Sequence, residues 1–163
     1  MKLVITDIED YKVPQDGEYS LIKPNGNIHN CVGCFGCWVK KPGECVIVDK
    51  YSRTGIELGK CNELILISRC YYGSTSPFIK MVMDRAISYI HPDFVIRKGE
   101  MHHKRRYDNV ITVSAYFYGK NITDDEKMTA TNLINANVDN YDGRVGNIQF
   151  YESAEEACQE VAL

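Results

Sequence analysis

Residues 64–90 read LILISRCYYGSTSPFIKMVMDRAISYI, and this stretch decides the fold. It opens on a short run that is apolar almost throughout, as in a parallel strand buried on both faces. Ser76 and Pro77 then combine a helix N-cap with a proline at the first helical position. Apolar residues continue at helical spacing to about Ile90, and Pro92 ends the predicted helix. The stretch therefore predicts a strand, a loop and a helix, the repeating unit of an α/β fold.

Working outward, short apolar runs on both sides of this unit predict further strands. The predicted strands are 3–5, 19–22, 64–68, 110–114 and 145–151. Helix-like stretches fall between them, at 77–90 and after Thr123 and Ser153, with a shorter one within 51–60. We predict one domain, residues 1–163, built on a doubly wound five-stranded parallel sheet.

The segment between the first two strands is unusual in both length and charge. It reads DIEDYKVPQDG over residues 7–17, with four acidic residues and one lysine. About a dozen residues barely allow a parallel crossover, and Pro14 and Gly17 interrupt the segment further. We therefore expect the first helix of the sheet to be shortened or absent. The acidic side chains would also repel a phosphate group.

Composition narrows the classes of function. The chain has 163 residues, of which 44% are hydrophobic and 25% charged, with a net charge of -3. Nucleic-acid-binding domains are usually basic, so we expect no nucleic-acid partner. No apolar run reaches the roughly 18 residues of a membrane span, and the N-terminus turns acidic too early for a signal peptide. These features predict a cytoplasmic protein.

Four of the seven cysteines lie within residues 31–45, which read CVGCFGCWVKKPGEC. The spacing is C-x2-C-x2-C-x7-C, and Pro42-Gly43 supplies a turn before the last cysteine. Soft thiolates at this spacing suit a [4Fe–4S] cluster or zinc. The alternatives are thiols without metal and a redox disulfide. The spacing leaves all of these open, whereas Cys61, Cys70 and Cys158 are predicted to be small buried hydrophobes.

Two segments carry a resemblance to a known family. The first is 31–45 with Asp49 behind it, and the second is SRCYYGSTS at 68–76, followed by Lys80, Asp84 and Arg85. Together they resemble the flavodoxin-fold NAD(P)H-dependent FMN reductases, especially the iron-sulfur flavoproteins. The resemblance covers roughly residues 19–115 and departs at Arg69, where the family usually has proline. It implies a flavodoxin-like fold and a homo-oligomer.

The resemblance also implies a function. It points to a flavin-dependent oxidoreductase or electron-transfer flavoprotein, such as an NAD(P)H-dependent FMN or quinone-type reductase. The electron donor would be NAD(P)H or a ferredoxin-like protein. Because the flavin carries the redox chemistry, no catalytic acid or base is expected. The alternative is a degenerate flavodoxin-like module that has lost FMN and serves as a binding or assembly protein, which the acidic segment 7–17 favours.

The resemblance assigns site residues by position. FMN would contact the loop after the third strand and the end of the fourth strand, at Cys70, Tyr71, Tyr72, Gly73, Ser74, Ser114, Ala115 and Tyr116. A [4Fe–4S] cluster would be held by Cys31, Cys34, Cys37 and Cys45. We expect the cysteine segment and the tyrosine loop to converge at one rim of the sheet and form a pocket for the flavin ring.

Two other groups of residues are expected to be structural. Lys80 and Asp84 are four apart on a predicted helix and should form a surface or interface pair. The basic run at 101–106 is interpreted as a solvated turn. Its adjacent histidines, His102 and His103, should not face one way, so a two-histidine metal site is not expected.

Overall fold

The computed structural model describes residues 1–161 and contains the predicted parallel sheet. Its five strands lie in the order β2-β1-β3-β6-β7, all parallel. The strands are β1 (Lys2–Thr6), β2 (Tyr19–Ile22), β3 (Glu63–Arg69), β6 (Thr112–Tyr118) and β7 (Arg144–Tyr151). Counted without the hairpin β4–β5, this is the 2-1-3-4-5 order of the flavodoxin-like fold. The predicted fold class is confirmed.

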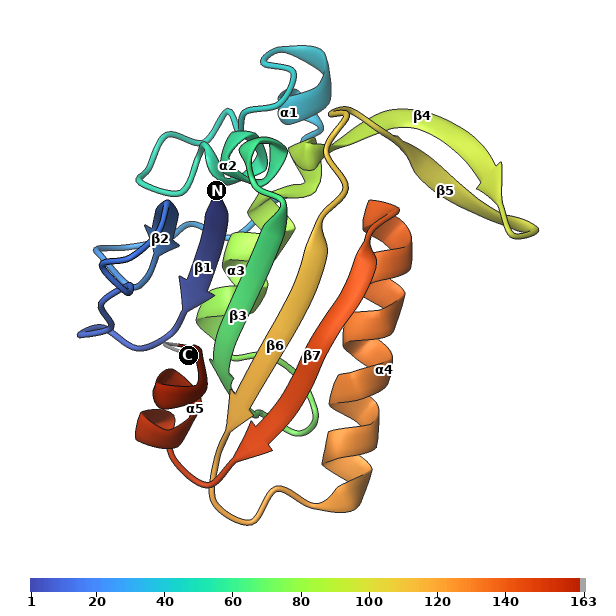
Figure 1. Cartoon of the computed structure of the whole chain (residues 1–163). Coiled ribbons are helices and arrows are strands. Elements are labelled where there is room, and N and C mark those ends of the chain that lie inside the picture. Colours follow the sequence, from blue (N-terminus) through green and yellow to red (C-terminus); the bar gives the residue numbers. More distant parts are fainter. Residues whose placement is uncertain (162–163) are drawn as a thin grey trace.

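Helices cover both faces of this sheet (Figure 1). One face carries α2 (Thr54–Lys60), α3 (Pro77–Arg85) and α4 (Asp124–Tyr141), while α5 (Ala154–Val161) covers the other. Two short turns, α1 (Gly36–Val39) and η1 (Ile87–Tyr89), complete the helical elements. Among residues 1–161, none of the helices has both the length and the apolar character needed to cross a bilayer.

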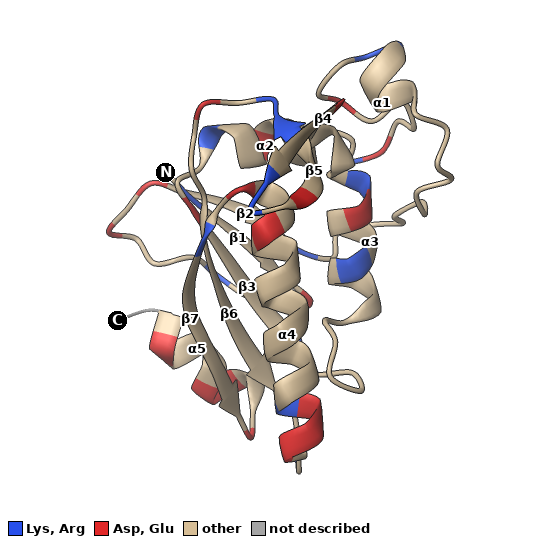
Figure 2. Ribbon diagram, turned by 90° about the vertical axis from the view of Figure 1, so that its right-hand side faces the viewer, with Lys and Arg blue, Asp and Glu red and all other residues tan. Residues whose placement is uncertain are grey.

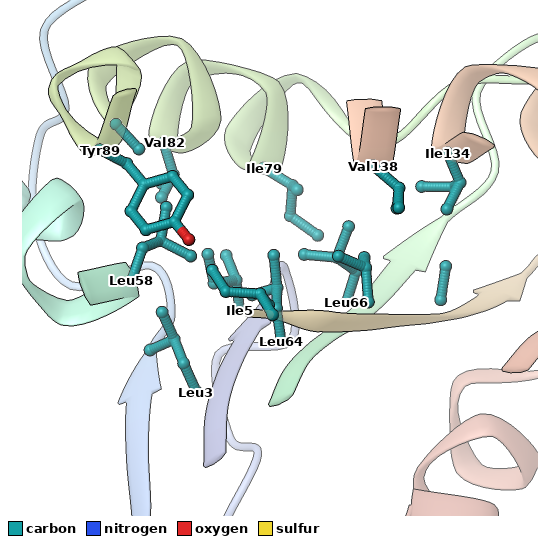
Figure 3. Close-up of a cluster of buried hydrophobic side chains, with 14 of the residues drawn as sticks. Leu3, Ile5, Leu58, Leu64, Leu66, Ile79, Val82, Tyr89, Ile134 and Val138 are labelled. Carbon is teal, nitrogen blue, oxygen red and sulfur yellow. The ribbon is translucent and has the colours of Figure 1, made fainter. Parts of the chain in front are cut away.

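The core divides according to the two-residue period of the strands. Leu64 and Leu66 of β3 face α3 and α4, whereas Ile65 and Ile67 face α5. Figure 3 shows the larger of the two clusters, in which Ile79 and Ile134 point from the helices toward the strands. Because β3 is buried on both faces, its sequence is apolar without alternation.

The helix termini follow the signals in the sequence. The Ser76 side chain accepts a hydrogen bond from the Ile79 amide, and Pro77 occupies the first turn of α3. Thr123 and Glu126 form a capping box at the start of α4. The α3 helix ends at Arg85 rather than near Ile90, because the chain turns through η1 and then enters a strand.

The first helix of the fold is absent, as predicted. Residues 7–18 contain no helix between β1 and β2. Tyr11 instead packs into the cluster beneath α5, where it is 6% exposed. Burial, with Cys158 and Tyr19 nearby, raises the pKa of this phenol to about 12. An aromatic side chain thus covers part of the sheet face that a helix would otherwise cover.

The basic run at 101–106 was wrongly interpreted as a turn. Most of it belongs to a projecting antiparallel hairpin of β4 (Ile90–Arg97) and β5 (Glu100–Arg105), seen at one side of Figure 1. Lys98 and Gly99 form the tip with φ of 50° and 85°. His102 and His103 face opposite sides of this hairpin, as expected for neighbours in a strand.

Candidate functional site

The strands β1, β3 and β6 are joined at their carboxyl ends by one side chain. Asp7 follows β1, and its carboxylate accepts hydrogen bonds from the Arg69 amide at 3.1 Å and from the Tyr118 hydroxyl at 3.0 Å. Burial, followed by the neighbouring Asp7 charge, raises the pKa of Tyr118. A carboxylate therefore already occupies the start of the loop that would have to hold a phosphate.

The tyrosine loop after β3 closes on itself. Tyr71 and Ser74 exchange backbone hydrogen bonds of 2.9 and 2.8 Å, around a tip in which Tyr72 and Gly73 have φ of 50° and 75°. Gly73 lies against α4, where an added Cβ would come within 2.7 Å of the Thr129 side chain. Tyr72 is 90% exposed at the tip. The loop packs on α4, and its Tyr71 and Ser74 amides bond within the loop.

The half-buried Cys70 begins this loop, and its amide donates to the Tyr118 carbonyl at 2.8 Å. Burial raises the pKa of its thiol.

The predicted flavin contacts of the fourth strand lie within the sheet rather than at its end. β6 begins two residues later than expected and runs on to Tyr118. Ser114 and Ala115 are therefore buried, at 4% and 1% exposure, and Tyr116 stacks on Tyr151 with ring centroids 6.4 Å apart. The expectation that these three residues end the strand was wrong, because the apolar pattern alone did not fix where β6 stops.

These observations test whether the carboxyl edge of one chain fits FMN. Residues 7–18 present no helix N-terminus to a phosphate, and Asp7 already accepts two hydrogen bonds there. In the tyrosine loop, the amides of Tyr71, Ser74 and Ser76 are all engaged within the chain. The end of β1 therefore lacks the phosphate site that a helix N-terminus would provide.

The cysteine segment lies at the other end of the sheet. In Figure 1, α1 sits beside the end where β1 and β3 begin, whereas the loop after β3 leaves from its arrowhead. Trp38 of α1 donates a hydrogen bond to the Ile90 carbonyl at 3.0 Å, which ties the segment to the base of the hairpin. The predicted convergence of the cysteine segment and the tyrosine loop was therefore wrong within one chain.

The four cysteines nevertheless come together around one cavity. It has a volume of about 620 Å³ and lies between α3 and α4 over the sheet. Its floor includes Leu64, Leu66 and Val113, and Cys31, Cys34, Cys37 and Cys45 all line it. In a single chain, the cysteine motif thus opens onto a cavity between helices that extends to Thr75, at the end of the tyrosine loop.

The cysteines differ in burial. Cys31 and Cys34 are exposed, whereas Cys37 and Cys45 are buried. Burial, then the nearby Cys45, raises the pKa of the Cys37 thiol, and Cys31 and Cys34 act in the same direction. Within residues 1–161, no three Cys, His, Asp or Glu side chains are close enough to form a ready metal site. The four thiols are neighbours, but they are not arranged as a closed ligand set.

A buried arginine anchors this segment. Arg85 is 1% exposed, and its Nε–H donates to the Cys45 sulfur at 3.1 Å. Its two terminal nitrogens bind the Asp49 carboxylate at 2.7 and 3.1 Å and the carbonyls of His29 and Ile47 at 2.8 Å each. All five N–H groups of the guanidinium are therefore engaged. In the sequence, Arg85 entered only as part of the family resemblance, and no pattern indicated that it contacts Cys45.

The Arg85–Asp49 pair is held ionised. Burial alone would raise the pKa of the Asp49 carboxyl. Hydrogen bonds from Arg85 and from the amides of Tyr51 and His29 outweigh that effect and lower the pKa to about 2. Lys80 and Asp84 form the predicted pair one turn earlier on α3, at 2.6 Å and on the surface.

Comparison with known proteins shows the fold of the chain but no particular activity. No protein-family profile matches the sequence, and no curated protein is similar to it. Among solved structures, the azoreductase AzrA superposes with a TM-score of 0.53 and 6% identity over 99% of both chains. A flavone reductase gives a TM-score of 0.49 and 11% identity over 99% of this chain, which spans 61% of that protein's length. The chain therefore has a flavodoxin-like α/β fold, while its own residues must carry any argument about activity.

Proposed function

We propose that this chain is a redox protein of flavodoxin-like fold whose redox group is bound by Cys31, Cys34, Cys37 and Cys45. The observation that carries the proposal is that all four thiols line one cavity, with the Arg85 Nε–H directed at the Cys45 sulfur. Four thiolates are the donor set that an iron-sulfur cluster requires. The donor set therefore fits a [4Fe–4S] cluster, which would supply one-electron chemistry when bound.

The chain's own residues would position the cluster ligands. Arg85 fixes Cys45 and, through Asp49 and the Ile47 carbonyl, the backbone that follows it. Phe35, with φ of 56°, and Gly43, with φ of 91°, turn the chain on either side of α1. Cys31 and Cys34 lie on an exposed loop whereas Cys37 and Cys45 are buried, so this loop would have to close over the cluster. A hydrogen bond to a ligand sulfur raises the reduction potential of such clusters.

Anaerobic purification, followed by iron and sulfide analysis and a visible spectrum, tests this proposal. We expect stoichiometric iron and sulfide and a broad charge-transfer absorption. Cys34→Ser should abolish both signals, whereas Cys158→Ser should keep them because Cys158 belongs to α5, on the other face of the sheet from the cavity. Protein without iron, or with zinc in its place, would contradict the proposal.

A second candidate is a binding or assembly module that does not hold FMN. The engagement of Asp7 with Arg69 and Tyr118 favours it, since a carboxylate stands where a flavin phosphate would bind. The FMN-dependent reductase, with NAD(P)H or a ferredoxin-like donor, stays a prediction. Equilibrium titration with FMN distinguishes the two candidates. Saturable micromolar binding of FMN would support the reductase. Colourless protein that binds neither FMN nor iron would support the binding module.

A further inference from the structure

The cavity between α3 and α4 is large enough to be a ligand site in its own right. Its volume of about 620 Å³ lies within the range of roughly 300–1,000 Å³ typical of small-molecule sites. The floor is formed by Leu64 and Leu66 of β3 and by Val113 of β6, and Met83 and Leu133 line the sides. Such a surface favours an apolar occupant.

Among residues 1–161, the Lys, Arg and Asp side chains that line this cavity are all paired. Lys80 is paired with Asp84 at 2.6 Å, and all five N–H groups of Arg85 are engaged. Residues 128–138 of α4 carry no charge, and this part of the helix is tan in Figure 2. A charged ligand would lose hydration here without gaining a partner, which is costly. The cavity therefore selects an uncharged compound.

The mouth of the cavity is aromatic. The rings of Phe35 and Trp38 are stacked with centroids 5.5 Å apart, and the His103 ring lies 5.1 Å from Trp38. All three side chains line the cavity. Flat aromatic surfaces favour offset stacking or edge contacts with another ring.

Polar side chains inside the cavity, Thr75 and Asn137 among them, can orient a ligand. Asn137 of α4 lines the cavity, and within residues 1–161 its side-chain amide makes no hydrogen bond to the protein. The amide can donate and accept. A ring compound with one carbonyl or amine group would match this arrangement.

We infer that the α3–α4 cavity binds an uncharged, planar aromatic compound, with its ring between the aliphatic floor and the Trp38 side and its polar group at Asn137. This inference goes beyond the proposed function, because nothing in the binding of such a compound requires a cluster on the cysteines.

Two fluorescent probes that share one skeleton provide the test. N-phenyl-1-naphthylamine is uncharged, and 8-anilinonaphthalene-1-sulfonate adds an anionic group. We expect saturable binding of the uncharged probe with quenching of Trp38, which is the only tryptophan. Binding of the sulfonate should be at least tenfold weaker. Equal affinities, or no binding of the uncharged probe, would overturn the inference.

Matched variants on α4 locate the binding. Asn137→Phe should fill the cavity and lower the affinity for the uncharged probe at least tenfold. Asn135→Phe, on the exposed side of the same helix, should keep that affinity within twofold of the wild-type value. If Asn137→Phe does not fold, Asn137→Asp adds a charge at nearly constant size and should weaken binding to a similar extent. Unchanged binding in the folded variant contradicts the inference.

The titration is repeated on protein as purified anaerobically and on protein stripped of iron. If iron-free protein binds the uncharged probe, the ligand site is supported even when iron analysis has disproved the cluster. A dimer in which a second copy fills the cavity and excludes the probe at every protein concentration overturns the ligand site alone. The two proposals can thus fail separately.

Discussion

Arg85 is the residue on which the cysteine segment depends most. It lies at the end of α3 and binds a sulfur, a carboxylate and two carbonyls from residues 29–49. Those residues contain only the short turn α1, so they have few backbone hydrogen bonds of their own. The hydrogen bonds of one buried guanidinium therefore fix the position of this segment, as the backbone hydrogen bonds of a longer helix or strand would.

Replacing Arg85 by methionine should destabilise the protein by about 3–5 kcal/mol, since it leaves the Asp49 carboxylate buried without its partner. Urea unfolding followed by circular dichroism measures the change. Lys80→Met is the matched control on the same helix and removes only an exposed pair, so it should cost no more than about 0.5 kcal/mol. Similar losses for the two variants would show that Arg85 does not anchor the segment.

The lowered pKa of Asp49 predicts how stability falls in acid. The Asp49 side chain is 7% exposed, and its pKa of about 2 in the folded protein lies below the 3.8 that is usual for an aspartate. A carboxyl group whose pKa is lower in the folded protein than in the unfolded chain stabilises the fold at pH values above its unfolded pKa. This stabilisation is lost as the pH falls through the pKa of the folded protein. The wild type should lose on the order of 2 kcal/mol between about pH 4 and pH 2 from this group.

Asp49→Asn cannot titrate at this position and provides the comparison. The difference in unfolding free energy between wild type and Asp49→Asn should shrink as the pH is lowered from about 5 to 2. A difference that stays constant over this range would mean that Asp49 has an ordinary pKa and that the pair with Arg85 is weak.

At the scale of elements, the hairpin β4–β5 is the main addition to the parallel fold. One of its faces reaches α4, where Arg97 donates to the Asp139 carbonyl at 2.7 Å. The other carries Phe94, Ile96 and Met101, which are 58%, 68% and 66% exposed. A two-stranded hairpin is marginal alone, so its stability depends on contacts at its base and on α4.

The tip of this hairpin offers a test of local stability. Lys98 and Gly99 both have positive φ, which suits Asn-Gly better than Lys-Gly. Gly99→Ala should destabilise the hairpin by about 1 kcal/mol, and Lys98→Asn should stabilise it. Hydrogen exchange of the β4 and β5 amides should change in opposite directions in the two variants, with the β3 amides unaffected. A matching change in β3 would mean that the hairpin unfolds only with the whole domain.

Sequence patterns predicted the elements unequally. β1 and β3 were found because buried parallel strands are apolar and bounded by polar residues, and the edge strands β2 and β7 were found from shorter apolar runs. The start of β6 was placed two residues early, and its end at Tyr118 was missed. The hairpin was missed entirely, since its strands are rich in charge and pair only with each other. Such strands lack the apolar pattern on which prediction relies.

At the scale of the whole molecule, the expected homo-oligomer stays a prediction. The apolar residues Val32, Phe35 and Val39 are 71%, 59% and 79% exposed beside the cavity mouth. Together with Phe94, Ile96 and Met101 on the outer face of the hairpin, they expose large apolar side chains at this end of the molecule. Surfaces of this kind commonly mark protein contacts.

Light scattering over a range of concentrations measures self-association. If the outer face of the hairpin is the contact, Ile96→Glu should shift the protein toward the monomer. Met128→Glu replaces an equally apolar side chain, 59% exposed on α4, and should leave the mass unchanged. A wild type that is monomeric at all concentrations would contradict the expected oligomer.

The sequence by itself determined the class of the fold, the absence of a helix in residues 7–18 and the presence of four cysteines at close spacing. These properties follow from local pattern, charge and chain length. Only the tertiary structure decided where the cysteines lie. It carries them to the amino end of the sheet, away from the tyrosine loop, and closes the carboxyl edge with Asp7. The physical reason is that these contacts join residues distant in the chain: Arg85 meets Cys45 across 40 positions and Asp7 meets Tyr118 across 111. The spacing of apolar residues within one segment cannot predict such contacts.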